Sequence, residues 1–148
     1  MFVPTLRQSN PRRQGDIGEM AAAEWLTRHG YVVWLPLCHS PDIDLLAQRG
    51  EAFFRVQVKT STAYRKGRFE VTLRTKGGNQ SWNGLAKRLD PSRYDYPFVL
   101  VADGRRWFIP ASSVGGCSGL RLGGPKYAEF EVDRRVADEA PFVHPDGS

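Results

Sequence analysis

The sequence is poor in cysteine and histidine, and the few that it has form no recognisable site. Of the 148 residues, two are cysteines, Cys38 and Cys117, and three are histidines. The cysteines lie far apart and form no CxxC pair, and the histidines are not spaced with them as zinc ligands are. These absences exclude a disulfide framework and a structural zinc as the basis of the fold. A reducing, cytoplasmic location is the simplest expectation.

Long apolar runs are also lacking. No stretch is long enough to span a bilayer, and residues 1–13 lack the apolar segment of a secretory signal. We therefore expect no membrane partner. The chain is 41% hydrophobic and 25% charged, which is close to the average of soluble globular proteins. Its length suits one domain, expected over residues 1–137, with a disordered tail at residues 138–148.

Positive charge is unevenly distributed along the chain. The segment from Arg55 to Arg93 contains ten Lys or Arg residues and two acids, Glu70 and Asp90, so its net charge is +8, while the rest sums to −3. An excess of this size suits a polyanion such as nucleic acid. The alternative on charge alone is a solvated surface that keeps the protein soluble.

The hydrophobic pattern predicts an α/β domain. β-Branched and aromatic runs predict strands at residues 31–35, 43–48, 52–59, 68–74, 97–102 and 106–109, and residues 127–132 alternate in the same way. The strand at 52–59 has few polar residues and is expected to be central. A short helix is expected over residues 82–89, whereas residues 120–124 resemble a loop.

An amphipathic helix is predicted near the N-terminus, and its start has two candidates. Asn10 before Pro11 fits an N-cap with proline at the first helical position. If the helix instead begins at Asp16, Glu19 completes a capping box three residues later. If it begins at Pro11, Glu19 lies in mid-helix at the edge of the apolar face and is available for function.

A polar cluster is predicted where the strands at 43–48 and 52–59 meet. Asp44 lies between apolar neighbours, and its carboxylate is costly to bury without a partner. A turn at the intervening glycine makes the two strands adjacent, and Gln57 and Lys59 share one face of the second strand. An acid, an amide oxygen and a lysine at one end of a sheet can hold Mg²⁺ and a phosphate together.

This arrangement resembles the PD-(D/E)XK nuclease superfamily. The resemblance is carried by Gly18-Glu19, Pro41-Asp42-Ile43-Asp44-Leu45-Leu46, Gln57-Val58-Lys59-Thr60 and Trp107-Phe108-Ile109-Pro110. It is greatest to the branch with Gln-Val-Lys-Thr, which includes group I intron homing endonucleases, and to members similar to Holliday junction resolvases. It implies a restriction-endonuclease-like α/β core, in which an N-terminal helix precedes a mixed central sheet flanked by helices.

The resemblance also implies a role for each residue of the cluster. Asp44 becomes the main metal ligand, and Gln57 and the backbone carbonyl of Val58 become further ligands. Glu19 assists the metal directly or through a water. Lys59 orients the attacking water and stabilises the phosphate charge. The implied cofactor is Mg²⁺, for which Mn²⁺ can substitute.

Two positions need comment within this resemblance. Asp42 follows Pro41 and so spells the start of the family motif, but it lies in the loop before the strand, and Asp44 is favoured. Gln57 stands where most of the superfamily has Glu or Asp. A neutral amide brings no charge, so it binds Mg²⁺ more weakly, although the resembled branch also uses Gln.

The sequence therefore predicts a Mg²⁺-dependent endodeoxyribonuclease that hydrolyses phosphodiester bonds. A dimer or higher homo-oligomer is implied by the resemblance, because cutting two strands takes two sites. A catalytically inactive nucleic-acid-binding module on the same fold is one alternative, and a protein whose basic stretch binds an acidic protein is another. The expected DNA contacts are Arg65, Lys66, Arg68, Lys76, Lys87 and Arg88.

Overall fold

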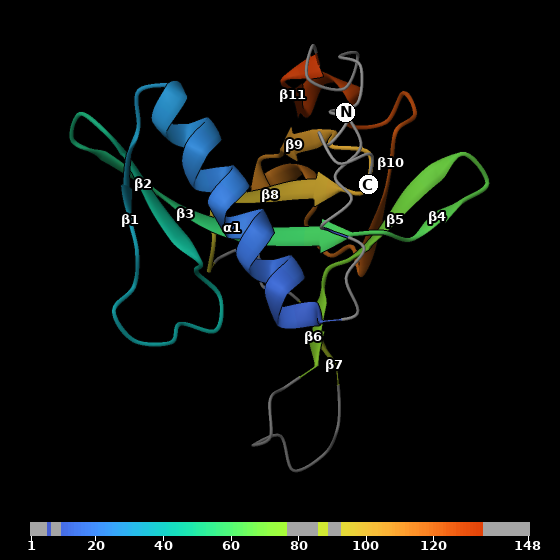
Figure 1. Ribbon diagram of the computed structural model, residues 1–148, viewed down its shortest axis with the longest axis horizontal. Helices are drawn as coiled ribbons and strands as arrows, with labels where there is room; N and C mark the ends of the chain where they lie inside the picture. The colour runs from blue at the N-terminus through green and yellow to red at the C-terminus, as the bar shows by residue number, and fades with distance from the viewer. Residues whose placement is uncertain (1–5, 7–9, 77–85, 89–92, 135–148) are drawn as a thin grey trace, which may run out of the picture.

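The computed structural model describes residues 6, 10–76, 86–88 and 93–134, with the backbone path alone for 74–76 and 86–88 (Figure 1). Its helix is α1 (Pro11–Arg28), and two short 3-10 turns are η2 (Ala111–Ser113) and η3 (Ala128–Phe130). The strands are β1 (Val32–Trp34), β2 (Leu45–Arg49), β3 (Ala52–Ser61), β4 (Tyr64–Arg65), β5 (Arg68–Thr72), β6 (Arg74–Lys76), β7 (Ala86–Arg88), β8 (Tyr96–Val101), β9 (Arg106–Phe108), β10 (Gly119–Leu122) and β11 (Glu131–Val132). The predicted tail at 138–148 lies outside the described residues.

Helix α1 begins where proline and an asparagine cap favour it. The side chain of Asn10 accepts hydrogen bonds from the backbone N–H groups of Arg12 and Arg13, at 3.1 and 3.4 Å, and Pro11 fills the first position. The alternative start at Asp16 is therefore wrong, and Glu19 lies in mid-helix. Within the described residues, no helix combines the length and the apolar character needed to cross a membrane.

The central sheet has six strands in the order β1-β2-β3-β8-β9-β11. The pair β3–β8 is parallel, and the other neighbours are antiparallel. The sheet is therefore mixed, as the sequence predicts. Strand β3 has a neighbour on each side, which confirms the central position predicted from its apolar composition.

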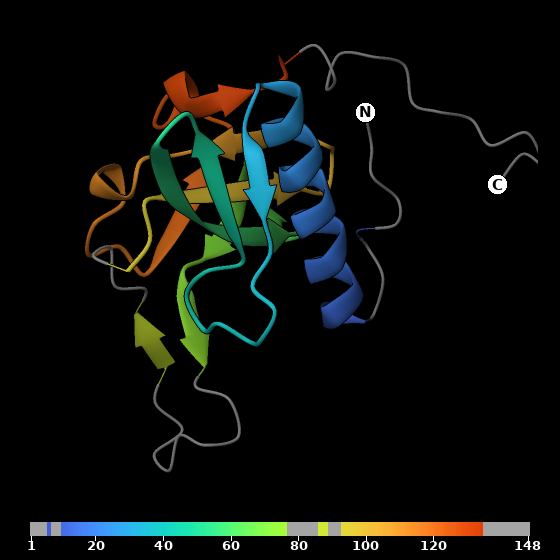
Figure 2. The same cartoon turned by 90° about the vertical axis from the view of Figure 1, so that its left-hand side faces the viewer.

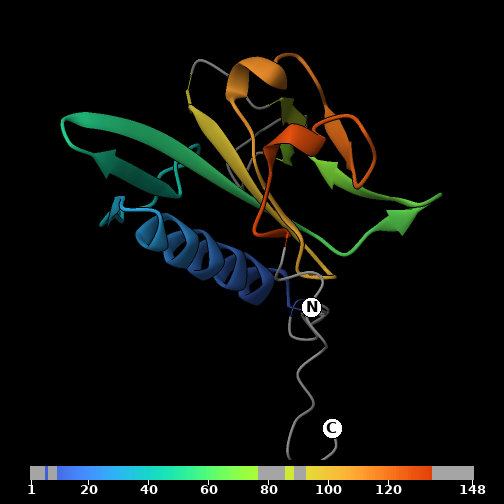
Figure 3. The ribbon, with the colours of Figure 1, turned by 90° about the horizontal axis from the view of Figure 1, so that it is seen from above.

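Helix α1 packs across one face of this sheet (Figures 1 and 3). Leu6, which precedes the helix, and buried side chains of the helix and of the three adjoining strands form one core: Leu6, Ala22, Trp25, Leu26, Leu45, Ala47, Val56, Val58, Phe98 and Leu100. Alternation along β3 directs Val56 and Val58 into this core. The intervening Gln57 and the following Lys59 therefore face the other side of the sheet.

The opposite face is covered by a second sheet of three strands, in the order β10-β5-β4 (Figure 3). Phe69 and Val71 of β5 and Leu120 and Leu122 of β10 pack there against β8 and β9 around Trp107. The sequence predicted that helices flank the sheet, but the described residues that cover this face form strands. The fold class is still the predicted α/β class with an N-terminal helix and a mixed sheet.

Two local predictions are wrong. Residues 119–122 form β10, because Leu120 and Leu122 alternate into the core and pair with β5, although a loop was predicted over 120–124. Ala86–Arg88 form β7, which pairs antiparallel with β6, where a helix was predicted over 82–89. In the alternating run at 127–132, only Glu131–Val132 form a strand, after a 3-10 turn.

Candidate active site

Asp44 lies just before β2 and is hydrogen-bonded to β3. The Asp44 N–H donates to the carbonyl of Val56 at 3.0 Å. The strand predicted at 43–48 begins only at Leu45, which pairs with Val56, so Asp44 lies in the bend before the strand rather than within it. The carboxylate turns back toward β3, where its Oδ2 accepts the N–H of Val58 at 2.7 Å. The structure thus brings together two of the residues that the sequence singled out.

Glu19 reaches the same place from α1. The helix crosses β3 so closely that a Cβ on Gly18 would lie 2.5 Å from Cγ2 of Thr60, and glycine permits this approach. Glu19 and Asp44 line the same pocket, and the negative charge of Asp44 acts on Glu19. Two acids from different elements are therefore close neighbours at this site.

Burial raises the pKa of both acids. Partial burial is the largest influence on Glu19, and the negative charge of Asp44 raises its pKa further. Burial also raises the pKa of Asp44, while the hydrogen bond from Val58 and the positive charge of Lys59 act in the opposite direction. A cation bound between these acids would lower both pKa values, because its positive charge offsets the burial and the repulsion between the carboxylates. The pair is therefore suited to bind a cation.

A pocket of about 260 Å³ opens onto this pair of acids. It is lined by Glu19, Leu35, Pro36, Leu37, Cys38, His39, Ser40, Ile43 and Asp44. Most of the wall comes from the loop that joins β1 to β2 (Figure 2). His39 was not singled out from the sequence, and only the path of this loop places it near Asp44.

Gln57 carries a buried acceptor without a partner. The side chain is 6% exposed, and its Oε1 makes no hydrogen bond with the described residues. An unsatisfied buried oxygen costs about 1–3 kcal/mol, so such groups are uncommon without a function. A cation or a water bound beside Asp44 would satisfy it.

Lys59 follows Gln57 on the same face of β3. Its pKa is lowered by burial, while the negative charge of Asp44 acts in the opposite direction. A partly desolvated ammonium group keeps a strong interaction with a neighbouring anion, because little water competes for it. Lys59 therefore suits contact with a phosphate at this end of the sheet.

Asp42, the other acid of the motif, is engaged elsewhere. Its Oδ2 accepts a hydrogen bond from Nη1 of Arg93 at 2.9 Å in a partly exposed ion pair. Asp44 has no such cation on its carboxylate among the described residues and lines the pocket with Glu19. The geometry is consistent with Asp44 rather than Asp42 as the functional acid.

The oxygen atoms available as metal ligands at this site suit a hard cation. The described residues contain no group of three or more His, Cys, Asp or Glu side chains that could hold a metal ion. They do bring two carboxylates, those of Glu19 and Asp44, into one pocket, and Asp44 is bonded to β3 at Val58, the residue after Gln57. The N–H and C=O of one residue point to the same edge of a strand, so the carbonyl of Val58 points toward Asp44 as its N–H does. An all-oxygen set of this kind suits Mg²⁺ or Mn²⁺ rather than zinc.

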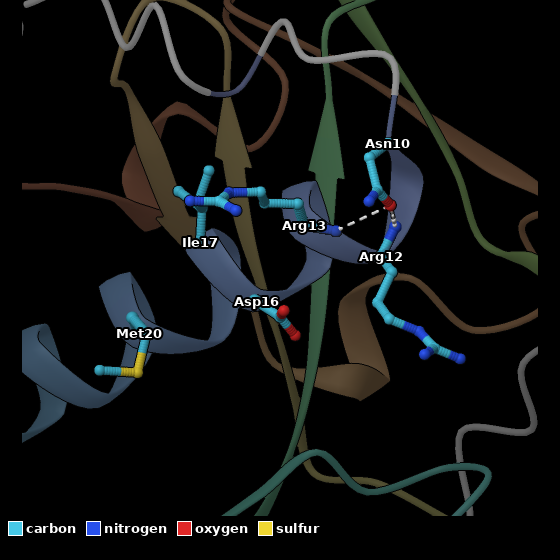
Figure 4. A pocket seen from close by; sticks show the side chains of 6 residues that line it. All are labelled: Asn10, Arg12, Arg13, Asp16, Ile17 and Met20. Atoms are coloured by element: carbon cyan, nitrogen blue, oxygen red, sulfur yellow. Dashed lines mark hydrogen bonds between the residues drawn. The ribbon is translucent and has the colours of Figure 1, made fainter.

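A wider hollow of about 490 Å³ lies at the start of α1 (Figure 4). All its lining residues come from the cap and the first turns of the helix: Asn10, Arg12, Arg13, Asp16, Ile17 and Met20. Figure 4 shows the oxygen of Asn10 held by the backbone N–H groups of Arg12 and Arg13. This hollow is lined by no residue from β2 or β3, and it is distinct from the candidate active site.

The predicted DNA contacts fall on two hairpins. Arg65, Lys66 and Arg68 belong to the β4–β5 hairpin, where Lys66 and Gly67 form the turn with φ of 52° and 75°. Lys76, Lys87 and Arg88 lie on the paired strands β6 and β7, which the structure describes as backbone alone. The sequence missed exposed Arg121, which β10 brings beside the first hairpin, because residues 120–124 were not recognised as a strand.

Curated relatives match this chain over short segments, and two of them are UPF0102 proteins. That of Chloroflexus aurantiacus is 42% identical over 53 residues, which is 33% of this chain and 42% of that protein. That of Symbiobacterium thermophilum is 45% identical over 58 residues, which is 38% of this chain and 49% of that protein. Each match therefore spans less than half of the curated relative.

The fold is also that of a solved nuclease. The structure of a bacterial homing endonuclease superposes with a TM-score of 0.65 at 21% sequence identity, over 84% of this chain and 88% of that one. A family model described as PD-(D/E)XK endonuclease matches residues 9–123. This range runs from the cap of α1 through β10 and includes the acids, the amide and the lysine described above. The chain belongs to the PD-(D/E)XK endonuclease family.

Proposed function

We propose that this protein is a metal-dependent DNA endonuclease that hydrolyses phosphodiester bonds. The observations that carry the proposal are the two partly buried acids, Asp44 and Glu19, that line one pocket, and the buried, unsatisfied oxygen of Gln57 on the adjoining strand β3. Such an arrangement is costly for a protein that never binds a cation, because it gathers negative charge and an empty acceptor. Family membership supports the reaction class.

The residues fit a bound Mg²⁺ or Mn²⁺. Asp44 and the oxygen of Gln57 would hold the ion, with the carbonyl of Val58 as a further ligand and Glu19 bound directly or through a water. When bound, the ion supplies positive charge that polarises the scissile phosphate and acidifies the attacking water. The Val58 N–H, bonded to Oδ2, fixes the orientation of the Asp44 carboxylate.

Lys59 acts from the same face of the strand. Its Nζ would hydrogen-bond a phosphate oxygen and balance the negative charge that develops there. Partial burial, which lowers its pKa, also eases a proton exchange between Nζ and the attacking water. The loop between β1 and β2 lines most of the pocket that holds the two acids.

A second candidate is a DNA-binding module without catalytic activity. The observation in its favour is Gln57 itself, because a neutral amide replaces the acid common in this superfamily and lowers the attraction for a cation. In this alternative the basic hairpins still bind DNA, and the acids remain protonated or hydrated.

The test is a cleavage assay on supercoiled, linear and branched DNA with Mg²⁺, with Mn²⁺ and with a chelator. The proposal expects cleavage that requires the metal and that is lost in Asp44→Asn. DNA binding without cleavage in either metal would favour the binding module. Cleavage that persists in the chelator would contradict the metal-dependent mechanism.

A further inference from the structure

The loop between β1 and β2 separates two pockets of opposite chemistry. On one side is the acidic pocket described above, with Glu19 and Asp44. On the other is an apolar pocket of about 220 Å³, lined by Trp34, Leu35, Pro36, Ser40, Ile43 and Leu46. Four residues line both pockets: Leu35, Pro36, Ser40 and Ile43. The two pockets are therefore immediate neighbours with a shared wall.

The two pockets are also joined along the chain. Leu46 of the apolar pocket pairs with Trp34 across β1 and β2, and it lies two residues after Asp44 of the acidic pocket. Because the pockets share four lining residues, a group bound beside Asp44 has the apolar pocket as its neighbour. A phosphate beside Asp44 would therefore bring the adjoining base toward the apolar pocket.

Trp34 offers a fixed aromatic surface in this pocket. Its Nε1 donates to Oε1 of Gln48 at 2.8 Å, and Nε2 of Gln48 donates to the carbonyl of Gly50 at 3.0 Å. The indole is nevertheless 53% exposed. Because its polar atom is satisfied within the protein, the exposed part is the apolar ring. A ring held in this way can stack on a base without first being ordered.

The loop itself adds exposed apolar side chains. Leu35 is 70% exposed and Leu37 is fully exposed, and both line the acidic pocket. Exposed apolar side chains are not stabilised by contact with water, and a contiguous group of them marks a surface that binds another molecule. Proteins that distort DNA use leucine and proline in this way, inserting them between bases that they unstack.

We propose that the apolar pocket receives an unstacked base of the DNA next to the scissile phosphate, with Trp34 as its stacking surface. The inference rests on the proposed nuclease function and assigns its substrate class. The preferred substrate is DNA in which a base beside the cut is unpaired, such as a bulge, a flap or a branch point. A fully paired duplex must first unstack a base, which costs a few kcal/mol.

The test uses the full chain and a duplex with one bulged 2-aminopurine, compared with the same duplex fully paired. Binding and the fluorescence of the 2-aminopurine are measured in a chelator, and cleavage is measured in Mg²⁺. The variants are Trp34→Ala, Trp34→Phe and Leu46→Phe, which narrows the pocket and keeps the indole. Phe53→Ala is the matched control, because Phe53 is 52% exposed and lines neither pocket.

The parent is expected to bind the bulged duplex more tightly and to quench its fluorescence by stacking. Trp34→Ala should weaken this binding about tenfold to a hundredfold. Leu46→Phe should also abolish the preference, whereas Trp34→Phe should keep most of it and Phe53→Ala all of it. Paired DNA should be bound similarly by every variant.

The outcomes separate this inference from the proposed function. If Trp34→Ala and Leu46→Phe still cleave DNA and still prefer the bulged duplex as the parent does, the base pocket is wrong. The proposed nuclease function is then unaffected. Bulge-selective binding without cleavage would support the base pocket and contradict the nuclease. If sedimentation shows instead that Trp34→Ala dissociates an oligomer and leaves DNA binding unchanged, the surface joins two copies of the chain and the inference is wrong.

Discussion

Asp44 is held in place by one backbone amide, and this makes it a clean position for testing function. The oxygen of an asparagine can still accept the Val58 N–H, so the fold should survive Asp44→Asn. Removing the charge should raise the reaction barrier by at least a few kcal/mol, which is roughly a hundredfold or more in rate. The measurement is the rate of plasmid cleavage, with DNA binding measured alongside.

A neighbouring acid provides the control for that experiment. Asp42 pairs with Arg93 and lies in the loop before β2, so Asp42→Asn should leave cleavage near the parent rate. The assignment of Asp44 fails if Asp44→Asn cleaves as the parent does, or if the two variants lose activity equally.

Substitutions of Gln57 distinguish an active metal site from one that has lost its activity. Gln57→Glu restores the charge common in the superfamily and should lower the Mg²⁺ concentration needed for half-maximal cleavage. In a chelator it should melt at a lower temperature than the parent, because it adds a third acid to Asp44 and Glu19. Gln57→Ala should lose most of its activity, since the ligand oxygen is gone. Metal titrations of cleavage that coincide for the parent and both variants would show that the side chain is not a ligand.

At the scale of elements, the β4–β5 hairpin is the clearest candidate for DNA contact. Arg65 is 72% exposed in its side chain, and Lys66 occupies the turn. Removing a side chain that binds a phosphate should weaken binding to all DNA sequences and should flatten the salt dependence by about one unit. Arg65→Ala and Lys66→Ala should both behave in this way when binding is measured from low to high salt.

Arg134→Ala serves as the control for the hairpin. Arg134 is also exposed but lies outside the basic segment, at the end of the described chain. If Arg65→Ala and Lys66→Ala bind DNA with the same salt dependence as the parent and as Arg134→Ala, the nucleic acid lies on another surface.

The parallel pair β3–β8 begins at an ion pair between Arg55 and Asp95. Oδ2 of Asp95 accepts the backbone N–H of Arg55 at 2.7 Å, and both carboxylate oxygens accept from its guanidinium at 3.2 Å. Burial alone would raise the pKa of Asp95, but the hydrogen bonds from Arg55 outweigh it and lower the pKa. The ionised carboxylate therefore stabilises the fold above the ordinary carboxyl pKa of about 4.

This stabilisation should disappear as the pH falls through the lowered pKa. Urea unfolding at pH 7 should show Asp95→Asn less stable than the parent by about 1 kcal/mol. The difference should be smaller at about pH 3, which lies below the ordinary carboxyl pKa of about 4. Glu51→Gln, in the exposed turn between β2 and β3, should match the parent at both values. A difference independent of pH would show that packing rather than charge is responsible.

The elements also show what the sequence could predict. The strands on either side of Gly50 followed from their composition, and with them the approach of Asp44 to β3. Strand β10 was missed because it is only four residues long and its alternation is hard to separate from a loop. Residues 86–88 favour a helix locally, but their pairing with β6 overrides that preference.

The contacts between distant segments could not be predicted in this way. The closeness of Glu19 and Asp44 depends on how α1 crosses the sheet, and the pair of Asp42 with Arg93 joins two loops far apart in the sequence. Neither contact leaves a local pattern, because each is set by tertiary packing.

At the scale of the whole molecule, the basic segment connects the candidate site to the expected DNA contacts. The +8 segment from Arg55 to Arg93 contains most of β3 and the whole of β4 to β7. Strand β3 carries Gln57 and Lys59 and then continues into the β4–β5 hairpin (Figure 1). DNA bound by the hairpins would therefore lie along the strand that holds the site.

If Asp44 and Gln57 form a metal centre, the folded protein should bind Mn²⁺ in the absence of DNA, and calorimetric titration measures this binding. We predict that the parent binds the ion and that Asp44→Asn, with the fold confirmed by circular dichroism, binds it at least about tenfold more weakly. Equal affinity in the two proteins, or no binding to a parent that still binds DNA, would show that these residues form no metal centre.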